Sequence, residues 1–130
     1  MLTENERRRY DRQMLIPGFG EAGQEKLRNA IVVIAGTGGL GSPAALYLAA
    51  AGVGRLRLAD SDSVSLSNLN RQLLHWTNNL GEGKTASAAA KLKELNPDIS
   101  IETFTGAIDE DNAGDLLGDA DGIVDALDNL

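Results

Sequence analysis

Four closely spaced glycines separate a short apolar run from an alanine-rich segment in residues 31–54 (IVVIAGTGGLGSPAALYLAAAGVG). Gly36, Gly38 and Gly41 have the spacing G-x-G-x-x-G, and Gly39 lies within it. Glycines let the backbone approach phosphate oxygens, and the start of a following helix offers unpaired N–H groups with about half a positive charge. The pattern predicts a phosphate site. By itself it does not separate the pyrophosphate of NAD from the triphosphate of ATP.

Polar residues after the second apolar run add to this site. Asp60 ends the run RLRLAD, where the dinucleotide pattern places an acid that binds a ribose hydroxyl, and Asp62 follows it. The next loop offers Asn68, Arg71 and Gln72, and the guanidinium of an arginine is a planar fork suited to phosphate oxygens. From the residues alone, a solvated loop arginine explains Arg71 equally well.

Two charged residues further along distinguish ATP from NAD. Lys84 begins an alanine-rich helix pattern, where a cation opposes the helix dipole by about 0.3–1 kcal/mol. A surface lysine could carry that penalty, but a bound anion would more than offset it. Asp128, followed by Asn129, would repel a triphosphate unless a divalent cation lay between them, and Mg²⁺ is usually held by one or two carboxylates and phosphate oxygens. An NAD site has no such need.

An alternation of strand and helix patterns must position these residues. Strands are predicted over 31–35, 55–60, 99–104 and 122–127, and helices over 4–15 (with a capping box from Thr3 and Glu6), 20–29, 41–51, 84–95 and 109–117. This order predicts an α/β, Rossmann-like, mainly parallel sheet with helices on both faces, preceded by N-terminal helices. Ligands of such sheets bind outside the carboxyl ends of the strands, where the strand order reverses. The glycines, Asp60 with Asp62, and Asp128 with Asn129 should meet there.

We expect a single unit, with a helical segment over 1–29 and a Rossmann-like ATP-binding half over 30–130. A doubly wound sheet normally continues past its fourth strand, so the pattern is typical of a truncated N-terminal part.

Charge and composition exclude several classes of function. The 12 basic residues all lie in 1–93 with 8 of the 19 acids, and 94–130 hold the other 11 acids, so a basic nucleic-acid-binding face is not expected. Five of these late acids lie on a short amphipathic segment and are expected to be solvated, namely Asp109, Glu110, Asp111, Asp115 and Asp119. The chain has no cysteine, so a thiol nucleophile or a cysteine zinc site is not expected within these residues.

No membrane segment or secretory signal is apparent, which predicts a cytoplasmic protein without a membrane partner. His75 has no nucleophile beside it in the sequence and is read as a packed residue, and Trp76 as a core or interface residue.

Five ordered stretches resemble the ThiF/MoeB/HesA family, bacterial relatives of the ubiquitin-activating enzymes. They are RYDRQMLIPGFGEAGQEKL, GTGGLGSPAALYLAAAGVG, DSDSVSLSNLNRQLLH, GEGKTASAAAKLKELNP and DALDN, which together span about Arg9 to Asn129. Five motifs in the family's order are far more specific than one glycine pattern.

The resemblance implies an adenylyltransferase that uses ATP and Mg²⁺ to activate the C-terminal Gly-Gly carboxylate of a ubiquitin-like sulfur carrier of the ThiS or MoaD type, usually as a homodimer. It implies that Arg71, Lys84 and Asp128 act at the phosphates, with Mg²⁺ on Asp128, and that Arg12 reaches the partner subunit's ATP. The nucleotide-binding residues it implies are Gly36, Gly38, Gly39, Gly41, Asp60, Asp62, Ser67, Asn68, Arg71, Lys84, Asp128 and Asn129.

The chain departs from the family pattern at three positions: Ser61 replaces a usual Phe, Thr37 a usual Ala or Leu, and Leu127 a usual Thr. The family's downstream half, which carries its zinc and catalytic cysteines, is also absent from these residues. Two alternatives therefore stay open: an NAD-binding oxidoreductase half-domain, and a nucleotide-binding fragment without catalytic activity.

Overall fold

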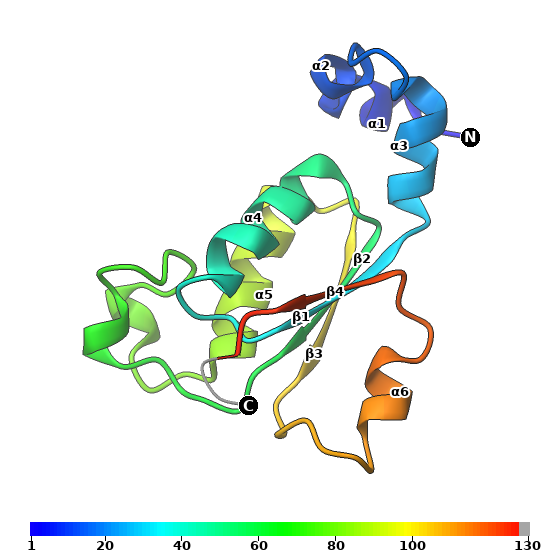
Figure 1. Ribbon diagram of the computed structural model, residues 1–130. Helices are drawn as coiled ribbons and strands as arrows, with labels where there is room; N and C mark the ends of the chain where they lie inside the picture. Colours follow the sequence, from blue (N-terminus) through cyan, green and yellow to red (C-terminus); the bar gives the residue numbers. More distant parts are fainter. Residues whose placement is uncertain (128–130) are drawn as a thin grey trace.

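A four-stranded parallel sheet forms the centre of the molecule, in a computed structural model that describes residues 1–127 (Figure 1). Its strands are β1 (Ile31–Ala35), β2 (Arg55–Ala59), β3 (Ser100–Phe104) and β4 (Gly122–Asp125). They lie in the order β3-β2-β1-β4, and every neighbouring pair is parallel. The chain moves outward from β1 to β3 and then returns to the other side of β1, so the strand order reverses between β1 and β4. The expected Rossmann-like fold is confirmed.

Helices cover both faces of the sheet. Helices α4 (Gly41–Ala51) and α5 (Lys84–Leu95) lie together on one face, and the short helix α6 (Ala113–Leu117) lies on the other (Figure 1). The larger core joins apolar strand residues to the alanine-rich faces of α4 and α5, whose small side chains allow close approach; it includes Ile34, Leu56, Leu58, Ala45, Ala49, Ala88 and Leu92. A smaller cluster under α6 contains Val33, Ala59 and Leu116.

Arg57 ties β2 to the end of α6. Its side chain, only 11% exposed, donates to the carbonyl oxygen of Leu116 (2.6 Å) and to the carboxylates of Asp119 (2.8 Å) and Glu102 (2.8 Å). The hydrogen bond from Arg57 holds the pKa of Asp119 below its usual value. Asp119 is exposed, as expected, but it also forms an ion pair with Arg57.

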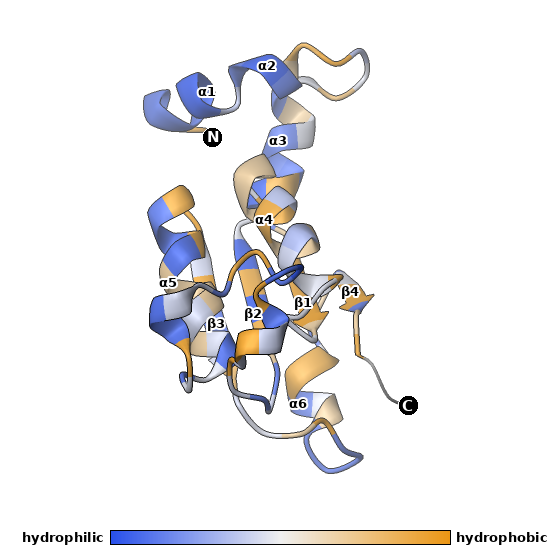
Figure 2. Ribbon diagram, turned by 90° about the vertical axis from the view of Figure 1, so that its left-hand side faces the viewer, coloured by the Kyte–Doolittle hydropathy of each residue, from blue (hydrophilic) through white to orange (hydrophobic). Residues whose placement is uncertain are grey.

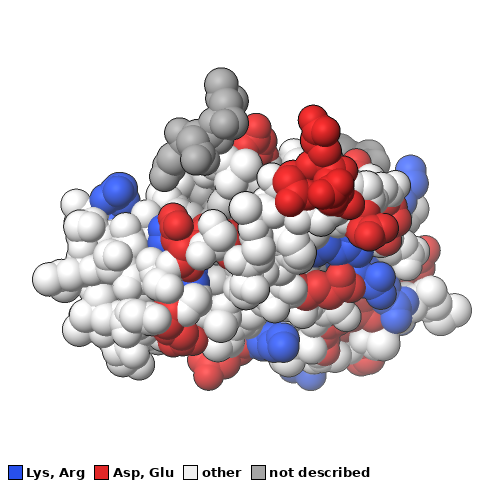
Figure 3. Space-filling model, turned by 90° about the horizontal axis from the view of Figure 1, so that it is seen from below, with Lys and Arg blue, Asp and Glu red and all other residues white. Residues whose placement is uncertain are grey.

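The other acids around α6 face solvent. Seen from the side where the strands end, acidic side chains gather on one part of the surface (Figure 3), and the exposed acids of this region are Asp109, Glu110, Asp111 and Asp115.

Three helices precede the sheet: α1 (Glu4–Arg9), α2 (Asp11–Met14) and α3 (Gly20–Arg28). The capping box of Thr3 and Glu6 is present, but the single helix expected over 4–15 is wrong. The backbone leaves helical geometry at Tyr10, whose buried hydroxyl accepts a hydrogen bond from Asn96 at the end of α5 (2.7 Å). The break in the helix therefore falls at a residue that makes a long-range contact.

These N-terminal helices lie at the end of the sheet where its strands begin (Figure 1), and α1 and α2 are largely hydrophilic (Figure 2). Polar contacts hold them to the sheet and its helices: the side chains of Gln13 and Gln24 both donate to the carbonyl oxygen of Ala51 at the end of α4. None of the helices in residues 1–127 combines the length and apolar character needed to cross a bilayer.

Candidate functional site

A pocket of about 430 Å³ opens at the carboxyl ends of the strands. The glycine turn after β1, the loop after β2, the start of α5 and the chain after β3 and β4 all line it. Five predicted site residues border it directly: Gly36, Gly38, Asp60, Asp62 and Lys84. The glycine turn and Asp60 with Asp62 therefore meet at the reversal of strand order, as predicted, together with Lys84.

Two glycines of the turn are required by backbone packing. Gly36 has a φ of +94°, and a Cβ on it would lie 2.6 Å from the carbonyl oxygen of Ala126. Gly41 begins α4, and a Cβ there would lie 1.8 Å from the carbonyl oxygen of Gly36. The turn can therefore fold tightly between β1, α4 and the chain after β4 only if both residues lack side chains.

Asp60 faces the glycine turn. Its Oδ2 accepts hydrogen bonds from the backbone N–H (2.8 Å) and the hydroxyl (3.0 Å) of Thr37, and its Oδ1 accepts one from the backbone N–H of Asp62 (2.9 Å). Thr37 is fully buried, whereas Asp60 is half-buried and lines the pocket.

Lys84 places a buried cation beside the pocket. Its side chain is 8% exposed, and among residues 1–127 its only ion-pair partner is the exposed carboxylate of Asp62, with Nζ 3.8 Å from Oδ2. The backbone N–H of Lys84 donates to the carbonyl oxygen of Asp62 (3.0 Å), which pins the start of α5 against this loop. An ammonium group at 3.8 Å from one solvated carboxylate is poorly compensated and would gain from a bound anion.

Arg71 lies just beyond the pocket lining. Carbons of its side chain stand 3.7 Å from where a Cβ of Gly39 would be, so it runs along the outer edge of the glycine turn. Its Nη1 donates to the carbonyl oxygen of Ser67 (3.0 Å) and to Asn70 (3.0 Å). The guanidinium is exposed and folded back on its own loop.

Ser67 and Asn68 lie on a short 3-10 helix (Leu66–Asn68) outside the pocket lining. The side chain of Asn68 accepts a hydrogen bond from the backbone N–H of Ser65 (2.8 Å) and caps this turn.

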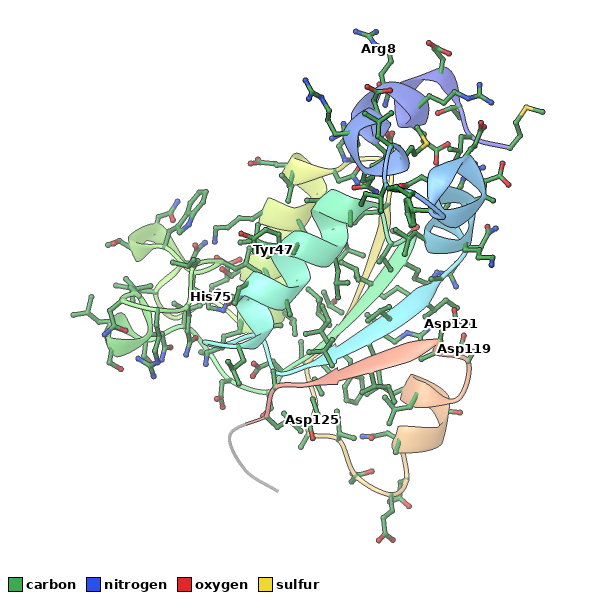
Figure 4. The ribbon with its side chains drawn as sticks, turned by 45° about the horizontal axis from the view of Figure 1, so that its top comes forward. Arg8, Tyr47, His75, Asp119, Asp121 and Asp125 are labelled. Atoms are coloured by element: carbon green, nitrogen blue, oxygen red, sulfur yellow. The ribbon has the colours of Figure 1, made fainter. Side chains whose placement is uncertain are left out.

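His75 supports the glycine turn from beneath. Its ring is 2% exposed, with Nε2 2.7 Å from the carbonyl oxygen of Thr37 and Nδ1 2.9 Å from the hydroxyl of Ser87 on α5 (Figure 4). A carbonyl oxygen can only accept, so Nε2 carries the proton. His75 is packed, as expected, whereas Trp76 is 54% exposed, with the ammonium of Lys91 4.5 Å from its ring centre.

We expect the free energy of unfolding to fall as the pH drops below about 6.5 because of His75. Burial lowers the pKa of its imidazole below 6.5 and is the largest cause; the hydrogen bond to the Thr37 carbonyl opposes it, the charges of Lys91 and Lys84 lower the pKa further, and Asp60 opposes them least. Between the two pKa values the unfolded chain binds a proton that the folded chain does not, so the free energy of unfolding rises with pH across that window.

Urea unfolding from about pH 8 down to about pH 5 measures this effect. His75→Gln keeps a donor for the Thr37 carbonyl without titrating, and it should flatten the dependence in that window. An equally steep dependence in His75→Gln would contradict the assignment.

Three predicted residues are not placed in the site. Asp128 and Asn129 lie outside the described residues. Asp125, the last residue of β4, precedes them in the chain (Figure 4). Arg12 is exposed on α2, at the opposite end of the sheet, so this chain does not bring it to its own pocket. Within residues 1–127 no three acidic, histidine or cysteine side chains come together as a metal site.

One wall of the pocket was not predicted from the sequence. Gly106, Ala107 and Ile108 follow β3 and form a wall of the pocket. None of them has a side chain that could do chemistry. Their position directly after a parallel strand could nevertheless have placed them at the ligand-binding edge of the sheet. Gln72 is 4% exposed beside Gly38, and its Oε1 has no hydrogen-bond partner among the described residues.

Known proteins resemble this chain in sequence and in fold. The model of the ThiF family matches residues 10–130. The chain is 51% identical over 128 residues to the adenylyltransferase and sulfurtransferase uba4 of Emericella nidulans, and 45% identical over 128 residues to the sulfur carrier protein adenylyltransferase of Thermus thermophilus. Each alignment covers 98% of this chain, but only 27% and 47% of those two relatives.

Among solved structures, the E. coli tRNA N6-threonylcarbamoyladenosine dehydratase TcdA in complex with ATP superposes with a TM-score of 0.92 at 27% identity. The match covers 99% of this chain and 53% of that one. The chain thus spans between about a quarter and about half of the proteins it resembles.

Proposed function

Because this chain belongs to the ThiF family, we propose that it is the ATP-binding part of an enzyme that adenylates the C-terminal Gly-Gly carboxylate of a ubiquitin-like sulfur carrier, of the ThiS or MoaD type, and releases pyrophosphate. The names of the uba4 and Thermus relatives support this substrate class, and the ATP complex of TcdA supports the nucleotide.

The observation that carries the proposal is the buried cation of Lys84 beside the glycine turn. Neutral amides alone would suit the pyrophosphate of NAD as well as a triphosphate. A cation that lines the pocket and has one distant, solvated ion-pair partner among the described residues favours the more highly charged ligand. In this assignment the amides at the start of α4 and Lys84 bind phosphates, and Asp60 binds the ribose.

The apolar wall at residues 106–108 is suited to the adenine base. Arg71 would turn from its present contacts with Ser67 and Asn70 toward the phosphates, along the Gly39 side of the turn. Ser67 and Asn68 would then face the nucleotide from the same loop.

The chemistry needs no general base. A C-terminal carboxylate has a pKa of about 3.5 and is ionised at neutral pH. One of its oxygens bonds to the α-phosphorus of ATP, the bond to the bridging oxygen breaks, and pyrophosphate leaves with that electron pair. The protein contributes alignment of the two substrates and compensation of charge on the phosphoryl oxygens by Lys84 and Arg71.

Mg²⁺ remains part of the proposal through Asp128. The two carboxylates that the structure places in the pocket are engaged elsewhere, Asp60 with Thr37 and Asp62 with Lys84. An acid just after β4 would complement them at the triphosphate, where Mg²⁺ neutralises phosphate charge. A homodimer would bring Arg12 of one subunit toward the ATP of the other, since the chain's own pocket is at the far end of its sheet.

The test is exchange of radiolabelled pyrophosphate into ATP by the complete natural polypeptide with candidate carriers. Exchange should require Mg²⁺ and a carrier that ends in Gly-Gly, and a carrier shortened by its last glycine is the matched control. Tight binding of NADH that is indifferent to Mg²⁺, without exchange, would support the oxidoreductase alternative. Binding of ATP without exchange with any carrier would support a nucleotide-binding protein without this activity.

A further inference from the structure

We infer that Thr37 is a positioning residue that sets, through Asp60, how tightly the pocket holds the ribose of its nucleotide. The inference rests on the proposed function, because it assumes that the pocket binds ATP.

Every polar atom of Thr37 is committed. Its N–H and hydroxyl both donate to Oδ2 of Asp60, at 2.8 and 3.0 Å. Its carbonyl oxygen accepts from Nε2 of His75 (2.7 Å) and from the hydroxyl of Ser42 (3.0 Å). The residue is fully buried, so no solvent competes for these bonds. The direction of the hydroxyl is therefore fixed by its surroundings.

Counted over residues 1–127, these bonds leave Asp60 with one open acceptor position. A carboxylate offers about four lone-pair sites. Thr37 occupies both on Oδ2, and the backbone N–H of Asp62 occupies one on Oδ1 (2.9 Å). The remaining site is on Oδ1, in a side chain that lines the pocket. Thr37 thus orients the carboxylate so that Oδ1 is available to one ribose hydroxyl.

Loss of the hydroxyl would not create an equivalent contact. The acceptor site freed on Oδ2 would face the buried side chain at position 37, where a ribose cannot reach. Asp60 would keep only the backbone N–H groups of Thr37 on Oδ2 and of Asp62 on Oδ1, so its carboxylate would be less firmly oriented. Binding of the ribose should weaken, while binding of the phosphates at the glycine turn and Lys84 should not.

The experiment compares the dissociation constants of ATP and 2′,3′-dideoxy-ATP by calorimetry, using the complete natural polypeptide. We expect the parent protein to bind ATP about tenfold more tightly, as a hydrogen bond to a charged group implies. Thr37→Val, which keeps the shape but lacks the donor, should reduce this ratio to about threefold or less by weakening ATP alone. Thr37→Ser keeps the hydroxyl and should retain the parent ratio.

A purely structural role would weaken both nucleotides equally, so an unchanged ratio in Thr37→Val would overturn the inference. Thr37→Ala provides the same comparison should the valine variant not fold, as judged by circular dichroism. If the parent binds both nucleotides equally, the inference is wrong while ATP binding stands. If the parent binds neither, the proposed function fails.

Discussion

Replacing Lys84 with methionine is expected to lower carrier-dependent ATP–pyrophosphate exchange by a factor on the order of 10²–10³. The side chain of Lys84 is buried beside the glycine turn and lines the pocket, and its one ion-pair partner among residues 1–127, Asp62, is 3.8 Å away and solvated. It can therefore stabilise charge that develops on the phosphoryl oxygens and on the leaving pyrophosphate. Methionine keeps the apolar stem packed at the start of α5 but removes the charge.

Lys93→Met is the matched control, because Lys93 lies on the same helix but is exposed and away from the pocket. It should retain parent exchange. Thermal unfolding of both variants separates lost catalysis from lost folding. Normal exchange in a folded Lys84→Met protein would remove Lys84 from the reaction and, with it, the main support for a triphosphate.

Gly41→Ala is expected to lower the free energy of unfolding by about 3 kcal/mol or more and to abolish detectable ATP binding. Its Cβ would lie 1.8 Å from the carbonyl oxygen of Gly36, and backbone on both sides leaves nothing flexible to move aside. Either α4 shifts away from β1 or the glycine turn opens. Both changes remove the amides from the position in which they would bind phosphate.

Gly114→Ala controls for the substitution itself. Gly114 lies in α6 with no atom within 4 Å of an added Cβ, so alanine should raise the free energy of unfolding by about 0.5–1 kcal/mol through helix propensity. Urea titration measures both variants. Equal midpoints for Gly41→Ala and the parent would mean that the turn is not packed as described.

Much of the fold was predictable because its signals are local. The strand over 31–35 and the helices over 41–51 and 84–95 have the bounds that the sequence predicted. The bounds of these elements depend on neighbouring residues in the chain. The apolar run is followed by a glycine, and the alanine-rich segments end at a glycine or just before a proline. The end of α1 did not follow such a rule: it falls at Tyr10, whose hydroxyl bonds to Asn96, 86 residues away.

The candidate site divides in the same way. Residue types and spacing by themselves determined that the glycine turn follows the first strand, that Asp60 follows the second, and that Lys84 begins a helix. In a parallel sheet the two strand ends lie at the same edge, which places these residues together. Only the tertiary structure decided that Thr37 donates to Asp60 and that His75 donates to the carbonyl oxygen of Thr37 in the glycine turn. It also decided that residues 106–108 form a wall of the pocket. Those contacts join segments 23 and 38 residues apart in the first two cases. Their side chains meet because the sheet brings distant strand ends together, and no local pattern of residues records that approach.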